Sequence, residues 1–179
     1  MPTWKSRGLR GSAFEEMVNK TNEKYEEFGL ALIQKIPTPI TPIEIDQKSR
    51  HITLAYFEKK STVDYIGAVQ GVPVCFDAKE SATDVFNLQN IHDHQVEFMN
   101  EFKRQKGIAF FLIYYTKRDL IYYMPIEEML VFVNRAKEGG RKSFRFEELK
   151  EEHFIVKHSG LLVPYLDMIA KELEEENNS

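Results

Sequence analysis

The longest apolar run in the 179-residue chain is Ile108–Tyr115, and its length limits what the chain can fold into. Eight residues suit a buried strand of a sheet and are far too few to span a bilayer. A helical pattern over His92–Lys106 ends at Gly107, just before this run. A second strand-like run, Leu120–Met124, follows the polar turn Lys117-Arg118-Asp119. The centre of the chain is therefore predicted to contain adjacent strands with a helix beside them.

The other elements are predicted from periodicity and from punctuating residues. Helices are expected over 12–28, from Pro125 to before Gly139-Gly140, and from Pro164 to about Glu176. Strands are expected over Phe28–Ile36, Thr62–Val69 and Val72–Lys79, and a hairpin over 43–57 around the turn 46–50. Together these predict an α/β fold in which a mixed sheet is flanked by helices. We expect one domain over 1–179, with a flexible basic arm over 1–11 and a protruding hairpin over about 40–60.

Composition narrows the class of protein. A hydrophobic content of 42% with 12% aromatic residues is typical of a folded domain rather than a disordered chain. The only cysteine, Cys75, excludes an intramolecular disulfide and suits a reducing compartment. The first residues lack the apolar stretch of a signal peptide. We therefore expect a cytoplasmic protein with no membrane partner.

Charge is unevenly distributed along the chain. The net charge of −4 gives no hint of a nucleic-acid partner. However, the first ten residues carry Lys5, Arg7 and Arg10 with no acid before Glu15. A second basic cluster surrounds the Gly139-Gly140 turn and consists of Arg135, Lys137, Arg141, Lys142 and Arg145. Such clusters are either ordinary solvated surface or phosphate contacts, and charge alone leaves both readings open.

Residues 61–80 contain the pattern that points to chemistry. If Gln70-Gly71 is a two-residue hairpin turn, cross-strand partners have position numbers that sum to 141. Asp64 then pairs with Asp77, and Thr62 pairs with Lys79. Residues two apart on a strand share a face, and directly opposed Cβ atoms lie roughly 4.5–5.5 Å apart. The two carboxylates are therefore predicted to be close enough to share one ion.

Two like charges facing each other destabilise a sheet, and burial increases the repulsion. A divalent cation resolves the conflict, and hard oxygen ligands favour Mg²⁺ or Mn²⁺. Lys79 would sit beside that ion as a point charge for a phosphate, an arrangement suited to phosphodiester hydrolysis. The alternative is a solvated surface ion pair between Asp77 and Lys79. Apolar neighbours such as Val74 and Phe76 argue against full solvation.

The Asp…Asp-x-Lys spacing resembles the PD-(D/E)xK nuclease superfamily, and longer strings are similar to the RecU-type Holliday junction resolvases. The resemblance extends from about residue 6 to residue 170. Its strings are Ser6-Arg-Gly8, Asn19-Lys-Thr-Asn22, Lys35-Ile-Pro-Thr-Pro39, Ala55-Tyr-Phe57, Thr62-Val-Asp-Tyr-Ile-Gly67, Phe76-Asp-Ala-Lys-Glu80, Leu88-Gln-Asn90, His92-Asp-His-Gln95 and Gly140-Arg-Lys142.

The resemblance implies a restriction-endonuclease-like core and a homodimer that nicks four-way junction DNA symmetrically, with Mg²⁺ as cofactor. It implies catalytic roles for Glu15, Asp64, Asp77 and Lys79, and it makes recombinase and branch-migration proteins candidate partners. The hairpin corresponds to the family's stalk, which enters the junction. The implied metal ligands are Thr62, Asp64, Asp77 and Gln95. The DNA contacts that we expect are Arg7, Arg10, Arg50, Phe57, Arg141 and Lys142.

The sequence departs from the family pattern at two points, and some residues and the function have alternative interpretations. The family usually has Glu at the position of Asp77, and its basic N-terminal extension is almost absent here. Glu15 is equally explained by a capping box with Ser12. The pair His92-x-His94 could indicate a zinc site, but residues two apart on a helix do not face each other. N-capping or packing at the start of a helix is the favoured interpretation. The alternative functions are a junction-binding accessory factor without cleavage activity and a restriction-type nuclease that reads duplex sequence.

Overall fold

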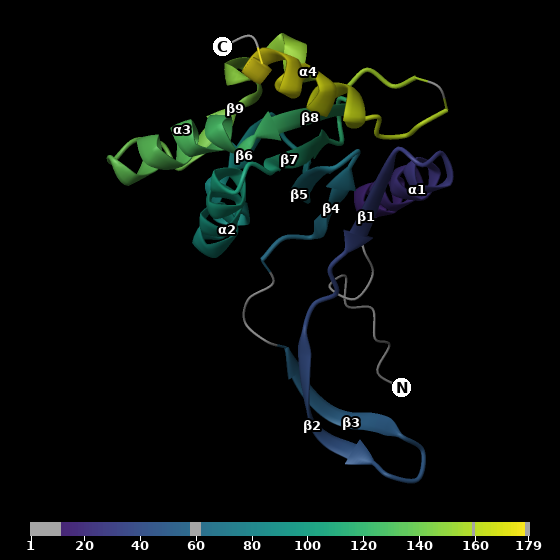
Figure 1. Cartoon of the computed structure of the whole chain (residues 1–179). Coiled ribbons are helices and arrows are strands. Elements are labelled where there is room, and N and C mark those ends of the chain that lie inside the picture. Colours follow the sequence, from purple (N-terminus) through teal and green to yellow (C-terminus); the bar gives the residue numbers. More distant parts are fainter. Residues whose placement is uncertain (1–11, 58–61, 159, 178–179) are drawn as a thin grey trace.

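The computed structural model describes residues 12–57, 62–158 and 160–177 and shows helices on both faces of a mixed sheet (Figure 1). A two-stranded ribbon projects from one end of this layered body. In the part of the chain that is described, no helix combines the length and apolarity needed to cross a membrane. The predicted α/β architecture with a protruding hairpin is confirmed.

The central sheet has five strands in the order β1-β4-β5-β7-β8. Only β5 and β7 run parallel, and the other neighbours are antiparallel. The predicted central strand is confirmed as β7, which is buried along its length except at Tyr114. The strand bounds are Ala31–Lys35 for β1, Tyr65–Val69 for β4, Val72–Ser81 for β5, Ile108–Tyr115 for β7 and Leu120–Pro125 for β8.

Each face of the sheet carries its own hydrophobic core. Helices α1 (Ala13–Glu27) and α4 (Leu166–Asn177) cover one face, where Phe76 stacks between Tyr65 and Phe110. Helices α2 (Asp93–Arg104) and α3 (Ile126–Lys137) cover the other face. Because side chains alternate along a strand, β5 contributes Phe76 to the first core and Cys75 to the second. Odd-numbered positions of β5 therefore face α2.

The predicted hairpin is confirmed as β2 (Ile40–Asp46) paired with β3 (His51–Phe57). The ribbon carries exposed apolar side chains on both strands, which is unusual for a two-stranded element that is only marginally stable by itself. These side chains are Ile40, Ile43, Ile45, Ile52, Leu54, Tyr56 and Phe57.

Short elements were not predicted. Strands β6 (Val85–Asn87) and β9 (Ser143–Arg145) form a second ribbon, and three-residue 3₁₀ helices follow at Leu88–Asn90, Phe146–Glu148 and Glu151–His153. Three residues are too few to show a period of 2 or 3.6 in sequence.

Two predicted strand starts are wrong. Phe28 closes α1 in helical conformation, and Gly29 follows with a φ of 64°, so β1 begins only at Ala31. Thr62 precedes β4, which begins at Tyr65. The last helix begins at Leu166, two residues after Pro164.

Candidate functional site

The hairpin turn of the chemical motif forms as predicted. Gln70 and Gly71 both have positive φ, at 47° and 88°, as a type I′ turn requires. The ladder between β4 and β5 runs from Val69↔Val72 to Tyr65↔Phe76, so its partners sum to 141. The next positions along the two strands are Asp64 and Asp77.

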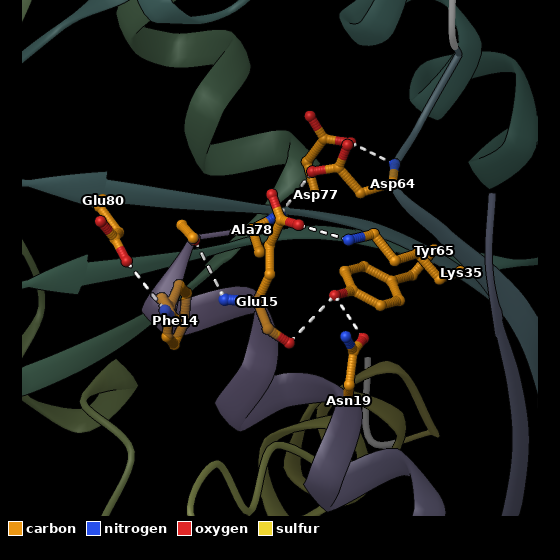
Figure 2. A network of polar contacts seen from close by, with 10 residues as sticks. Phe14, Glu15, Asn19, Lys35, Asp64, Tyr65, Asp77, Ala78 and Glu80 are labelled. Atoms are coloured by element: carbon orange, nitrogen blue, oxygen red, sulfur yellow. Dashed lines mark hydrogen bonds and ion pairs between the residues drawn. The ribbon is translucent and has the colours of Figure 1, made fainter. Parts of the chain in front are cut away.

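Asp64 and Asp77 meet where this ladder ends, but their side chains replace its next hydrogen bonds. The Asp64 N–H donates to Asp77 Oδ1 at 2.7 Å, and the Ala78 N–H donates to Asp64 Oδ2 at 3.2 Å (Figure 2). The Asp64 carbonyl accepts from the Ile36 N–H at 2.8 Å. Regular pairing therefore stops here, which is why the predicted Thr62–Lys79 pair does not form within the ladder.

Asp77 is fully buried and is held from two further sides. Lys79 Nζ lies 2.9 Å from Asp77 Oδ2, and Gln95 Nε2 donates to the same oxygen at 2.5 Å. Gln95 stands on the first turn of α2, and its Oε1 accepts the His92 N–H at 3.2 Å. That second bond sets the orientation of the amide, so its nitrogen faces the carboxylate.

The electrostatics of the site are dominated by the two aspartates. Burial first, then the negative charge of Asp77 and, to a smaller extent, that of Glu15 together raise the pKa of Asp64 to about 6. Lys79 and the hydrogen bond from Ala78 oppose that pKa shift only in part. The predicted repulsion between the aspartates is therefore present, and a cation between them would relieve it.

This repulsion predicts a pH-dependent stability in metal-free protein. The folded Asp64 carboxyl holds its proton up to a pKa of about 6, against 3.8 ordinarily, so unfolding becomes easier as pH rises between these values. In EDTA near pH 7, Asp64→Asn should be more stable than wild type by on the order of 1 kcal/mol after allowing for solvent screening. The gain should shrink as pH falls and vanish below about pH 3, where the carboxyl is protonated in both the folded and the unfolded state. Urea unfolding across this range measures it.

A matched control is Asp84→Asn, because Arg118 lowers the pKa of Asp84 instead. The Asp84 contribution is present above the unfolded pKa and is lost as pH falls. Its replacement should therefore destabilise the protein at neutral pH. Parallel pH profiles for wild type and Asp64→Asn would contradict the proposed repulsion.

Glu15 lies at the edge of the site on α1. Ser12 Oγ accepts the Glu15 N–H at 3.1 Å, so half of the predicted capping box is present. The Glu15 carboxylate itself bonds to Lys35 Nζ at the end of β1, and its charge reaches Asp64. The sequence does not indicate that Lys35 is a partner of Glu15, because the two residues become neighbours only when α1 packs against β1 in the folded protein. Figure 2 shows both beside the aspartates.

The donor set fits a hard divalent cation in part. Asp64, Asp77 and, further out, Glu15 offer carboxylate oxygens, the ligands that Mg²⁺ takes in proteins. Among the described residues, no three His, Cys, Asp or Glu side chains are grouped closely enough to hold a metal by themselves. His92 and His94 stack on each other at 5.4 Å, and His92 is the N-cap residue of α2. These positions agree with the N-capping or packing role that the sequence favours for the pair.

The predicted DNA contacts lie in separate regions. Arg50 is at the turn of the β2–β3 ribbon with a φ of 57°, and Phe57 ends that ribbon with 61% of its surface exposed. Arg141 Nη2 lies 3.1 Å from Glu148 Oε1, whereas Lys142 is exposed. Arg7 and Arg10 lie outside the described residues.

Comparisons with known proteins give a consistent family. The model of the family described as "RecU: Recombination protein U" matches residues 9–171. The Holliday junction resolvase RecU of Pediococcus pentosaceus is 35% identical over 172 residues, which cover 93% of this chain and 86% of that protein. The protein of the same name from Lactococcus lactis is 38% identical over 169 residues, covering 92% and 78%. The Bacillus licheniformis protein is 38% identical over 154 residues, covering 84% and 75%.

Among solved structures, Hjc from Archaeoglobus fulgidus, a Holliday junction resolvase, aligns with a TM-score of 0.41 at 9% identity. The alignment covers 63% of this chain and 77% of that one.

Proposed function

The chain belongs to the RecU family, and from that premise we propose that it is a structure-selective endonuclease. It would resolve Holliday junctions by Mg²⁺-dependent symmetric nicking in recombination and DNA repair. The observation that carries the proposal is the pair formed by half-buried Asp64 and fully buried Asp77, with Lys79 against Asp77. Junction binding alone does not require two opposed carboxylates, so this arrangement favours the enzyme over a non-catalytic accessory factor. We propose a cytoplasmic location, because the protein would cleave chromosomal or phage DNA there.

Each residue of the site has a distinct task in this proposal. Asp64 and Asp77 would hold Mg²⁺, for which Mn²⁺ should substitute, and Lys79 would offset charge on the scissile phosphate. When bound, the ion supplies a Lewis acid for the phosphate and a water of lowered pKa. Glu15 would orient that water from the α1 side. Thr62, half-buried two residues before Asp64, remains a proposed ligand.

The hydrogen bonds of Gln95 support a positioning task, beside the metal ligation expected from the resemblance. Its Oε1 bonds to the His92 N–H and its Nε2 bonds to Asp77. A direct bond from its oxygen to the metal would require the amide to turn over. We therefore propose that Gln95 orients the Asp77 carboxylate in the arrangement described here.

Cleavage of a synthetic four-way junction, compared with linear duplex of the same arm sequence, tests the proposed function. We expect paired, symmetric nicks in the junction and little cutting of the duplex, only with Mg²⁺ or Mn²⁺ present. Junction binding without cleavage would favour the accessory factor, and preferential duplex cutting would favour a restriction-type nuclease.

Symmetric nicking needs two active sites related by a twofold axis, so the active particle is proposed to be a homodimer. Light scattering on the free protein and on its junction complex measures this. A particle that stays monomeric and still makes symmetric nicks would contradict it. Recombinase and branch-migration proteins remain proposed partners.

Arg141 and Lys142, which follow the Gly139-Gly140 turn, are expected to bind DNA phosphates with an affinity that does not depend on DNA shape. Lys142→Ala should weaken binding to junction and duplex alike and lower the log–log salt slope by about one unit. Arg141→Ala should lower that slope by less, because Arg141 is already paired with Glu148. Titrations at several salt concentrations measure both slopes, with Lys171→Ala on α4 as the control. A loss confined to the junction would contradict a phosphate role.

A further inference from the structure

A contact on the opposite face of β5 links the strand that carries the aspartates to the helix that carries Glu15. Glu80 follows Lys79 on β5 and, because side chains alternate, faces α1. Its Oε1 accepts the Phe14 N–H at 2.9 Å (Figure 2). Asp77 and Glu80 are separated by about 10 Å along one strand. The strand therefore fixes both the metal-site carboxylate and the start of α1.

The hydrogen bond to Glu80 is placed where it controls the next residue. A helix leaves its first N–H groups without partners in the helix itself. In α1, Glu80 accepts from Phe14, whereas Ser12 Oγ accepts from Glu15. Ser12 belongs to the same segment and moves with it. Glu80 is the acceptor that ties this turn to the sheet, and a carboxylate at a helix N-terminus is also favoured by the helix dipole.

Packing alone does not define the position of this turn. The buried Phe14 ring stacks on Tyr114 with centroids 5.2 Å apart and planes at 29°. Ring stacking of this kind keeps most of its energy when the ring slides, whereas a hydrogen bond weakens steeply with angle. The Tyr65 hydroxyl on β4 donates to Asn19 Oδ1 at 2.9 Å, and it reaches the Glu15 carbonyl only at 3.4 Å. The bond to Glu80, at 2.9 Å, is therefore the shorter of these two hydrogen bonds between the sheet and the backbone of the first turn.

We propose that Glu80 is a positioning residue of the nuclease: by holding the Phe14 N–H it sets the first turn of α1, and with it the Glu15 carboxylate, relative to Asp64 and Asp77. This inference rests on the proposed function and on the role proposed there for Glu15. Glu80 itself touches neither substrate nor metal. Its effect is exerted through Glu15.

Single-turnover cleavage of a four-way junction at saturating protein and Mg²⁺ tests the proposal. Glu80→Ala should lower the rate about tenfold, since a displacement below 1 Å costs less than the hundredfold of larger misplacements. Glu80→Asp should behave alike because its carboxylate falls short of Phe14, and it serves if the Ala variant fails to fold. Glu80→Gln keeps an acceptor oxygen and should restore the rate to within about threefold. Junction affinity without metal should stay within about twofold in all of them.

A double-mutant cycle separates positioning from general structural damage. In a Glu15→Gln background, Glu80→Ala should slow cleavage by less than about twofold more, because residues that act through one another are not additive. The control is Glu172→Ala on α4, whose carboxylate accepts from Tyr123 on the edge strand β8 and from Lys103 on α2. It should lose stability without losing cleavage. Equal losses in both backgrounds, a wild-type rate in Glu80→Ala, or no rescue by Gln would overturn the proposal.

Amide hydrogen exchange in metal-free protein gives a readout that does not depend on cleavage. Glu80→Ala should speed exchange of the Phe14 amide at least tenfold while leaving the amides of Val18 to Glu27 near their wild-type rates. Unchanged exchange at Phe14 would overturn the positioning contact. If wild-type protein leaves junctions uncut while Glu80→Ala still shows this exchange pattern, the proposed function and the catalytic part of the Glu80 role are overturned, and the contact itself stands.

Discussion

Asp77→Asn is expected to lower junction cleavage in Mg²⁺ by about three orders of magnitude or more, while junction binding stays within a few-fold of wild type. Metal-assisted charge stabilisation is worth several kcal/mol, and each 1.36 kcal/mol is a factor of about ten in rate. Asn keeps the shape of the side chain and one oxygen for the Asp64 N–H. It loses the charge that a cation needs and leaves Lys79 without its buried partner. Asp64→Asn is expected to lose cleavage for the same reason.

The measurement is single-turnover cleavage alongside equilibrium binding of the same junction. A matched control is Asp84→Asn, which removes a carboxylate that pairs with Arg118 on the surface and should leave cleavage unchanged. Full cleavage activity in either Asp64→Asn or Asp77→Asn would contradict the proposed metal site. If a variant loses junction binding together with cleavage, the replaced residue contributes to DNA binding instead.

The aspartate pair could be predicted from sequence because its geometry is local. A two-residue turn at Gln70-Gly71 sets the register of both strands, and the position numbers of Asp64 and Asp77 differ by only 13. The part of the prediction that is wrong is also local: the pattern predicts that this strand begins at Thr62, whereas Asp64 leaves the ladder and β4 begins at Tyr65. Propensity does not show that an Asp side chain will take over a backbone hydrogen bond.

Contacts between distant segments could not be predicted. Glu80 and Phe14 are 66 residues apart, and Gln95 reaches Asp77 across 18 residues and from a different element. The alternation along β5 indicates that Glu80 faces away from Lys79, but it does not indicate what packs there. Resemblance placed Gln95 near the metal, yet the direction of its amide depends on the His92 N–H at the start of α2. Such orientations follow from tertiary packing rather than from spacing.

The second large effect is expected when the β2–β3 ribbon is shortened. Replacing Asp46–His51 with Asn-Gly joins Ile45 to Ile52, which already face each other, so the remaining register is kept. This variant should lose the preference for four-way junction over duplex, by about tenfold or more in the ratio of dissociation constants. A projecting element can enter the open centre of a junction, whereas phosphate contacts are the same on both substrates. The aspartate site, which lies on the sheet and not on the ribbon, should be spared.

Two controls separate shape from charge. Arg50→Ala removes the cation at the ribbon's turn without shortening it, so it should weaken both substrates and flatten the salt dependence by about one unit. Urea unfolding and the raised pKa of Asp64 should remain as in wild type after shortening, because Asp64 and its neighbours belong to the sheet. Equilibrium binding of both variants to both substrates at several salt concentrations gives the answer. If the shortened ribbon keeps full junction preference, the shape of the junction is read elsewhere, and the exposed apolar side chains of β2 and β3 need another role.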